Sequence, residues 1–224
     1  LKEMKARVAE ELDYLRESEA QRSFAAAYEG DPDYVVPHVL AASPKIIISE
    51  WVEGESLSKV IANGTPEQRD RAGTLYLTFL LSGPKRAGML HADPHPGNFR
   101  MTEDGRLAVL DYGAAARLPD GFPLAVGRIL RIALDEGDGQ SVVDGMREEG
   151  FLKPNVVIDP ERLLSYLLPF VEPLRKPSFH YSRTWLRSQF SRINDPRDGD
   201  FGVGLKLNLP PSYLLIHRVW LGSI

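Results

Sequence analysis

The order of the expected elements predicts an α+β fold, in which short strands precede a mass of helices. Two β-branched apolar runs bounded by Pro and Ser, Tyr34-Val-Val-Pro37 and Lys45-Ile-Ile-Ile-Ser-Glu50, indicate strands early in the chain. Apolar residues at helical spacing dominate after residue 122. With 43% hydrophobic and 26% charged residues among 224, the chain has an ordinary globular composition and is long enough for one substantial domain, or one and a half small ones.

Charge and cysteine content exclude several function classes. The net charge of −4 provides no basic face, so we expect no nucleic-acid partner. The sequence contains no cysteine, which removes disulfides, thiolate zinc sites and cysteine nucleophiles and suits the reducing cytoplasm. No apolar run approaches the roughly 20 residues that a membrane-spanning helix needs. Because Leu1 already lies in a helical pattern, we expect an excerpt of a longer protein with sequence missing before it, and we leave open whether more follows Ile224.

In the first half of the sequence, apolar residues at helical spacing predict the helices, and Gly and Pro indicate where they begin or end. The apolar residues from Leu1 to Leu15 recur every three or four positions and predict an amphipathic helix that ends near Gly30. Thr65 is the expected N-cap of a long helix that has Pro66 in its first turn. The other expected elements of this half are a connector over 51–54 and helices over 55–62 and 66–87.

The second half begins with a loop and a hairpin. The segment from His91 to Asn98 is too rich in Pro and Gly for a helix or strand. Two short strands bracket a turn at Glu103-Asp-Gly105, and the second strand spans 106–111. We expect an exposed loop over 195–204, whose glycines resemble a phosphate-binding loop only superficially because no strand precedes them. Helices are expected over 122–150, 160–171 and 184–193.

The clearest chemical signal lies in two short segments, His91-Ala-Asp-Pro-His-Pro-Gly-Asn98 and Leu110-Asp-Tyr-Gly113. Protein kinases place an Asp in a catalytic loop, an Asn five residues later and a second Asp in an Asp-Phe-Gly turn. Here Asp93 and Asn98 are five residues apart, and Asp111 follows Asp93 by 18 residues at the end of an expected strand. This spacing, together with the strand, connector and helix upstream, predicts a phosphate-handling site.

The chemistry of phosphoryl transfer explains these residue types, because it requires positioning and charge neutralisation more than covalent catalysis. Asn98 and Asp111 offer hard oxygen ligands for Mg²⁺. Asp93 can orient an attacking hydroxyl or water and accept its proton. Gly113 lets the chain turn away after Asp111, so that the carboxylate points into the cleft.

More ordinary explanations exist for each residue taken alone. Asp, Asn, Pro and Gly populate turns, so Asp93 and Asn98 could be turn formers, but the complete set of spacings favours function. For His91 we favour a structural hydrogen bond from its ring to the backbone of the loop or turn over proton transfer. For His95, contact with a substrate and simple filling of the position are equal alternatives.

The loop and the turn closely resemble the catalytic core of the UbiB/AarF family of atypical kinases, and three further segments agree. Glu10-Glu-Leu-Asp-Tyr-Leu-Arg-Glu17 resembles the family's E-x-D motif, which Glu11 and Asp13 carry. The segment 47–54 resembles the hinge that holds the adenine, and 209–218 resembles the helical tail of the family. The resemblance spans essentially the whole chain, which looks like an N-terminally truncated, actinobacterial member.

This resemblance implies a protein-kinase-like fold that binds ATP and Mg²⁺. It divides the chain into a partial N-lobe (1–50), a hinge (51–54) and a helical C-lobe (55–224), with Glu50, Trp51 and Val52 at the nucleotide. It also implies a role in isoprenoid quinone or lipid metabolism, a quinone-precursor or lipid ligand, and peripheral contact with a membrane. Side chains two residues apart on a helix point in directions that differ by roughly 200°. Only one of Glu11 and Asp13 is therefore expected to face the cleft.

Departures from the family pattern limit the expected activity. The sequence lacks three features of the family: a lysine in a V-A-x-K strand, a Gly-rich or Ala-rich loop that covers the nucleotide, and the K-x-G-Q extension. We therefore expect this stretch of chain to be inactive alone. Only residues 114–120 separate Gly113 from the next expected helix, too few for the activation segment of a conventional protein kinase, which favours ATP hydrolysis or a small or lipid acceptor. Two alternatives stay open: a phosphotransferase of the aminoglycoside or choline kinase type, and a nucleotide-sensing scaffold without enzymatic activity.

Overall fold

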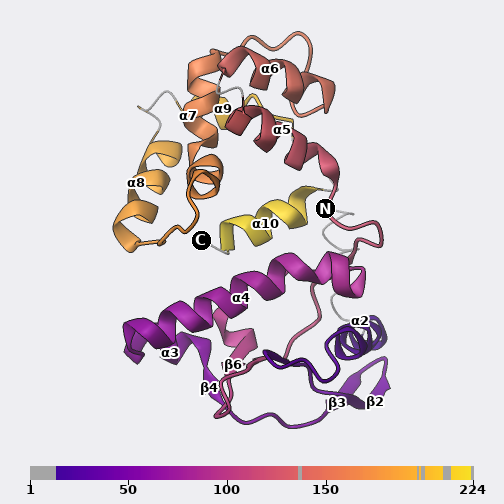
Figure 1. Ribbon diagram of the computed structural model, residues 1–224. Helices are drawn as coiled ribbons and strands as arrows, with labels where there is room; N and C mark the ends of the chain where they lie inside the picture. The colour runs from indigo at the N-terminus through magenta and orange to yellow at the C-terminus, as the bar shows by residue number, and fades with distance from the viewer. Residues whose placement is uncertain (1–13, 136–137, 196, 198–199, 209–212, 223–224) are drawn as a thin grey trace. The chain divides into compact units, whose positions relative to one another are not determined.

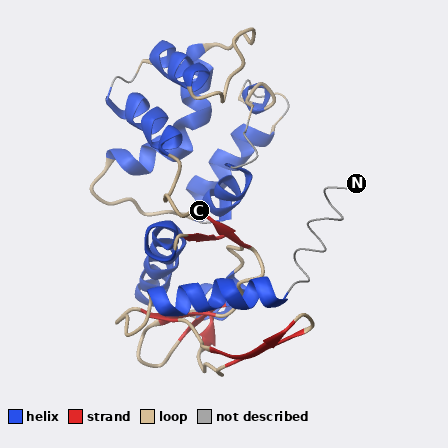
Figure 2. Ribbon diagram, turned by 90° about the vertical axis from the view of Figure 1, so that its right-hand side faces the viewer, coloured by secondary structure: helices blue, strands red, loops and turns tan. Residues whose placement is uncertain are grey.

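The structure is a computed structural model that describes residues 14–135, 138–195, 197, 200–208 and 213–222 (Figure 1). These residues form two compact units. The first contains the described residues up to Phe122 together with 215–222, and the second contains the described residues between Pro123 and Leu214. Strands occur in the first unit and only helices in the described part of the second, which confirms the predicted α+β class (Figure 2). The connector 51–54 lies inside the first unit.

The first unit is built from small sheets and a few helices. Its central sheet has the strand order β1-β7-β6-β4, in which β1 runs parallel to β7 and the other neighbours are antiparallel. Two further antiparallel pairs, β2 with β3 and β5 with β8, complete it. The elements are α2 (Tyr14–Ala27), β1 (Tyr34–Val35), β2 (Val39–Ser43), β3 (Ile46–Ser49), β4 (Glu55–Ser56), α3 (Leu57–Asn63), α4 (Pro66–Ala87), β5 (Met89–His91), the 3-10 turn η1 (Pro96–Asn98), β6 (Phe99–Met101), β7 (Leu107–Val109), β8 (Ala115–Arg117) and, from the end of the chain, most of α10 (Leu214–Gly222).

The long helix α4 begins and ends where local signals place it. The Thr65 hydroxyl accepts a hydrogen bond from the Gln68 N–H, and the Gln68 side chain accepts one from the Thr65 N–H, so both form a capping box ahead of Pro66. At the other end Gly88 adopts a left-handed conformation with φ 64°. The predicted bounds of this helix are therefore confirmed.

A buried aromatic cluster joins α2, α4 and the strands of the first unit. Phe24 of α2 lies with its ring centroid 5.5 Å from that of Phe79 on α4 and 5.1 Å from that of Tyr112. Gly83 permits this approach, because a Cβ at that position would lie 3.2 Å from the Phe24 ring and 2.7 Å from the Met89 carbonyl oxygen. Such rings supply most of the apolar area that a small core can bury. The cluster consists of Phe24, Tyr28, Tyr34, Phe79, His91, Phe99 and Tyr112.

The second unit contains helices joined by loops in its described part, and its core includes fully buried Ala133, Val142 and Leu163. Asp138 begins a separate helix, since its carboxylate accepts hydrogen bonds from the N–H groups of Gln140 and Ser141. No helix among the described residues is long and apolar enough to cross a membrane. The elements are α5 (Leu124–Asp135), α6 (Gly139–Glu148), α7 (Pro160–Val171), η2 (Glu172–Arg175), α8 (Arg183–Asn194) and α9 (Phe201–Gly204).

Several expected elements differ from the observed ones. The single helix expected over 122–150 is two helices because of the Asp138 cap, and the loop expected over 195–204 ends in the short helix α9. The helix expected from Glu55 starts at Leu57, because Glu55 and Ser56 pair with β6 as strand β4. Strands β2, β5 and β8 were not predicted. Strands β2 and β8 contain two alanines each, and because alanine is depleted in strands, their sequences do not indicate this structure.

The aromatic cluster should carry much of the stability of the first unit. Phe79→Ala removes a fully buried ring and should lower the free energy of unfolding by about 3–5 kcal/mol, measured by urea denaturation. Leu40→Ala is the control, since Leu40 is 65% exposed and its loss should cost far less. Equal losses for the two variants would contradict the assignment of the core.

Candidate functional site

Two strand pairs bring the two predicted segments together. Residues 92–98 connect β5 to β6, and residues 110–114 connect β7 to β8. Because β5 pairs with β8 and β6 pairs with β7, each segment is fixed at both ends beside the other. The Ala92 N–H donates to the Ala114 carbonyl at 2.8 Å, and the Leu110 N–H donates to the Asn98 carbonyl at 2.9 Å. The pairing therefore places Asn98 and Asp111 at the same end of the β6–β7 hairpin.

The Asp93 carboxylate accepts two side-chain hydrogen bonds. Its Oδ2 accepts from Asn98 Nδ2 at 2.7 Å, and its Oδ1 accepts from an Arg218 guanidinium nitrogen at 2.6 Å. The Asp93 side chain is 26% exposed, so it lies at the edge of the core and remains reachable. Because an ionised carboxylate has no proton to donate, the Asn98 amide must turn its nitrogen toward Asp93. The Asn98 amide oxygen is then the group that faces away and can meet a cation.

Asp111 is exposed and shapes the turn that follows it. Its Oδ1 accepts a hydrogen bond from the Gly113 N–H at 2.9 Å, which is the side-chain-to-backbone pattern of an Asx turn. A Cβ at position 113 would lie 3.4 Å from this oxygen, which is ordinary van der Waals contact. The turn thus holds the Asp111 carboxylate by one oxygen, and the other oxygen accepts no hydrogen bond from the described residues.

His91 is a structural residue in this arrangement. Its Nε2 donates to the Asp111 carbonyl oxygen at 2.6 Å, and its ring is 2% exposed among the aromatic cluster. Burial lowers the pKa of His91 below its usual value of 6.5, so the ring is neutral with its proton on Nε2. Within the described residues its Nδ1 has no partner, which a neutral acceptor tolerates better than a charged donor would. The ring therefore ties the loop to the turn backbone, the role that the sequence favoured.

His95 turns back onto its own loop. Its Nδ1 accepts a hydrogen bond from the Gly97 N–H at 3.1 Å and so caps the 3-10 turn η1. The residue is otherwise exposed. This cap helps to fix the short distance between Asp93 and Asn98, since η1 ends at Asn98.

Glu17 of α2 reaches the same turn, although it was not among the predicted site residues. The pKa of Glu17 is raised by burial and further by the nearby Asp111 charge, while a hydrogen bond from the Tyr112 N–H opposes this rise. Glu17 follows Asp13 by four positions, about one helical turn, and this spacing was the signal that could have identified it. Glu11 and Asp13 themselves lie outside the described residues.

Arg218 was also missed, and no local signal could have found it. It lies 125 residues after Asp93 in sequence and reaches Asp93 from α10. A cavity of 650 Å³ adjoins this side of the site and is lined by both acidic and basic side chains, Glu17 and Arg218 among them.

The predicted hinge residues have different environments. The Glu50 N–H donates to the His38 carbonyl at 3.0 Å, and the Glu50 carboxylate accepts from the His38 N–H and its ring at 2.9 Å. Trp51 is 81% exposed. Within the described parts of the chain, the N–H groups of Trp51 and Val52 form no hydrogen bond. The Glu50 side chain is thus committed to His38, whereas the backbone of 51–52 remains available to a ligand.

The donor set at the loop and turn fits Mg²⁺ that is bound together with a nucleotide. The described residues contain no group of three or more His, Asp or Glu side chains suited to a metal ion. Mg²⁺ in nucleotide sites uses one or two protein oxygens, waters and phosphate oxygens. The Asn98 amide oxygen and the Asp111 carboxylate match this smaller requirement.

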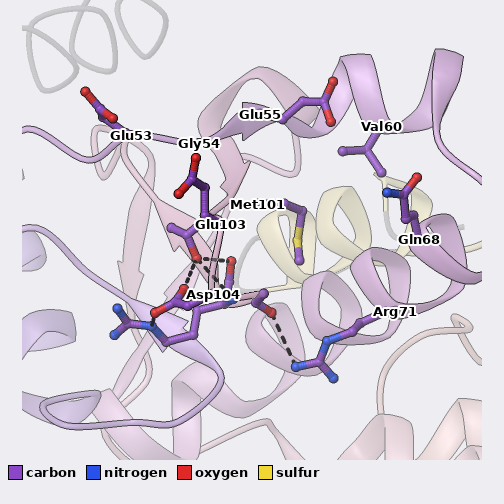
Figure 3. Close-up of a pocket in the computed structure, with 12 residues that line it drawn as sticks. Glu53, Gly54, Glu55, Val60, Gln68, Arg71, Met101, Glu103 and Asp104 are labelled. Carbon is purple, nitrogen blue, oxygen red and sulfur yellow. Dashed lines mark hydrogen bonds and ion pairs between the residues drawn. The ribbon is translucent and has the colours of Figure 1, made fainter.

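A second pocket of 810 Å³ is lined in part by Glu53 and Gly54 of the expected hinge (Figure 3). It is formed by the connector after β3, the start of α4 and the β6–β7 turn. Arg71 points toward that turn and donates to the Gly105 carbonyl at 3.3 Å, and Arg106 pairs with Asp104 at 2.7 Å. None of the predicted site residues lines it.

Comparison with known proteins gives consistent matches. Residues 1–144 match the sequence model of the ABC1 atypical kinase-like domain. The chloroplastic protein Activity of bc1 complex kinase 3 of Arabidopsis thaliana is 28% identical to this chain. The match covers 96% of this chain and 29% of the Arabidopsis protein. An uncharacterized Synechocystis protein is 33% identical over 67% of this chain and 27% of its own length.

Among solved structures, Rv3197 of Mycobacterium tuberculosis, determined in complex with erythromycin, matches with a TM-score of 0.85 and 35% identity. The match covers 99% of this chain and 55% of that protein. The chain thus spans less than a third of the two curated relatives and about half of the solved one. Together with the sequence-model match, this likeness confirms the predicted protein-kinase-like fold.

The buried state of His91 predicts a specific pH dependence of stability. Since its pKa is lowered in the folded chain, the stability that it provides is fully present above about pH 6.5 and is lost as the pH falls, because the unfolded chain then binds the proton first. His91→Gln cannot titrate, so its free energy of unfolding should decrease less than that of the wild type between about pH 7 and about pH 5.

His38 provides a control, because its contribution to stability should change with pH in the opposite direction. Hydrogen bonds to Glu50 and Glu29 raise its pKa, so its contribution is present below its unfolded pKa and is lost as the pH rises. His38→Gln should therefore make the loss of stability on the acid side larger. Parallel curves for wild type and His91→Gln would contradict a neutral, buried His91.

Proposed function

Since this chain belongs to the ABC1 atypical kinase-like domain family, the UbiB/AarF family, we propose that it binds ATP with Mg²⁺ and acts in phosphotransfer or ATP hydrolysis. The observation that carries the proposal is the 2.7 Å hydrogen bond between Asn98 and Asp93, formed beside a strand-terminal Asp111. This hydrogen bond shows that the two residues that have the five-residue spacing of a kinase catalytic loop are also in direct contact. Because the chain spans only part of its relatives, the proposed activity is that of the full-length protein.

Each residue of the loop has a distinct role in this proposal. Asp93 orients the attacking hydroxyl or water and accepts its proton, because its carboxylate is held by Asn98 and is still partly exposed. Asn98 and Asp111 would hold the cation, which would neutralise charge on the nucleotide phosphates. His91 and Gly113 contribute only through the position of Asp111.

The nucleotide base is proposed to lie against the connector after β3. Trp51 and Val52 present backbone groups there that the described chain does not use. The Glu50 N–H is bonded to His38, so Glu50 takes part through its carbonyl oxygen or not at all. Glu11 and Asp13 are proposed to complete the site.

The acceptor is proposed to be small or lipid rather than a protein. The segment after Gly113 forms β8, and its pairing with β5 uses residues 115–117 directly. Helix α5 follows at Leu124, so no long peptide-binding segment separates them. The relatives include a protein named for bc1 complex activity, which fits a role in isoprenoid quinone or lipid metabolism and contact with a membrane surface.

Two alternatives are less well supported. A phosphotransferase of the aminoglycoside or choline kinase type does not account for the match to the ABC1 domain. A nucleotide-sensing scaffold is consistent with the fold and could use Asn98 and Asp111 as cation ligands, but it gives no reason for Asp93 to be held beside them.

The proposal is tested by ATP hydrolysis of the full-length protein with Mg²⁺, with and without liposomes. Asp111→Asn should abolish metal-dependent turnover, and Asp93→Asn should reduce it by about 10²–10⁴-fold, the usual contribution of a general base. Asp120→Asn is the matched control, because Asp120 is exposed and outside the loop, and it should leave turnover unchanged. Mg²⁺-dependent ATP binding without turnover under any condition would instead support the scaffold.

A further inference from the structure

The end of the chain returns to the proposed catalytic loop through α10. Ile216 and Val219 are buried in the first unit, which anchors the helix, while Arg218 lies between them on the exposed side. From there Arg218 donates to Asp93 Oδ1 at 2.6 Å. Helix packing therefore supplies the energy that brings this guanidinium to the loop.

Tyr76 of α4 fixes both the loop and the end of α10. Its hydroxyl donates to the Pro94 carbonyl at 2.5 Å and lies 3.1 Å from the Gly222 carbonyl oxygen. Burial, and secondly the Asp93 charge, raise the pKa of Tyr76, so the phenol stays protonated and able to donate. One side chain thus holds the residue after Asp93 and the last described turn of α10.

Close backbone contact completes this attachment. A Cβ at Gly222 would lie 2.2 Å from Pro94 Cγ, a distance that requires something to shift. Glycine at this position lets α10 lie directly against Pro94. The Arg218 pair is therefore one part of a built contact between α10 and the loop.

The ion pair is too exposed to hold α10 in place by itself. The side chains of Arg218 and Asp93 are 50% and 26% exposed, and such surface pairs contribute little to stability. Its effect is geometric instead. Asn98 fixes one carboxylate oxygen of Asp93 and Arg218 fixes the other, so the carboxylate plane cannot rotate freely.

We propose that Arg218 is a positioning residue, which orients the Asp93 carboxylate toward the attacking group from helix α10. This inference rests on the proposed role of Asp93 as the residue that accepts the proton. It assigns a function in the reaction to α10, which lies outside the matched residues 1–144.

The test compares steady-state ATP turnover of full-length wild type and Arg218→Ala. Turnover should fall by about 10–100-fold, because small misplacements of catalytic groups have effects of that size, while the KM for ATP should change little. Guanidinium ion, far below denaturing concentrations, should restore part of the activity of Arg218→Ala, and Arg218→Lys should retain more activity than Arg218→Ala. If Arg218 had a merely structural role, neither added guanidinium ion nor the Arg218→Lys substitution would restore activity relative to Arg218→Ala. Arg131→Ala, which removes an exposed arginine of α5, is the control for charge and should behave as wild type.

A second variant separates this inference from the proposed function. Asp93→Asn should retain residual turnover, and adding Arg218→Ala should slow that turnover no further, since the two residues act as one unit. A strong loss of turnover in Asp93→Asn, together with unchanged or faster turnover in Arg218→Ala, would overturn the positioning role and leave the proposed function intact. Full activity of Asp93→Asn would overturn the proposed role of Asp93 itself. If Arg218→Ala unfolds on heating well before wild type, the Arg218→Lys comparison decides the question.

Discussion

The hydrogen bond from His91 Nε2 to the Asp111 carbonyl oxygen is the constraint on which the candidate site depends. It links the start of the loop to the turn, and it lies within the aromatic cluster, where Phe24, Phe79 and Tyr112 exclude water from the ring. In such surroundings the hydrogen bond is costly to break, because the buried His91 ring would lose its partner without regaining water. The position of the polar site is thereby fixed by the apolar core beneath it.

The polar contacts above this core are individually weak and act together. Asn98 and Arg218 each hold one oxygen of Asp93, and Gly113 holds one oxygen of Asp111. None of these interactions is buried enough to stabilise the fold substantially. Strand pairing and helix packing bring the groups within reach, and the hydrogen bonds then select their orientation. The carboxylates therefore stay at least partly exposed while strand pairing holds the backbone on either side of them.

Sequence reasoning succeeded where the signals are local. The capping box at Thr65 determined the start of α4, and the five-residue spacing of Asp93 and Asn98 corresponds to a direct hydrogen bond. It failed where the cause is tertiary. Strands β2 and β8 form because partners are available, not because their alanines favour strands. Arg218 reaches Asp93 through the fold, and pairwise spacing carries no information about such a contact.

The linkage between Mg²⁺ and ATP binding tests the central claim most directly, because it requires no acceptor to be known. Titration calorimetry on the full-length protein would compare ATP affinity with Mg²⁺ and with chelator, in wild type and in Asp111→Asn. The account predicts that Mg²⁺ tightens ATP binding to the wild type and that this gain is lost in Asp111→Asn. Equal dependence on Mg²⁺ in both proteins would contradict the assignment of Asp111, and with it the site built on the His91 constraint.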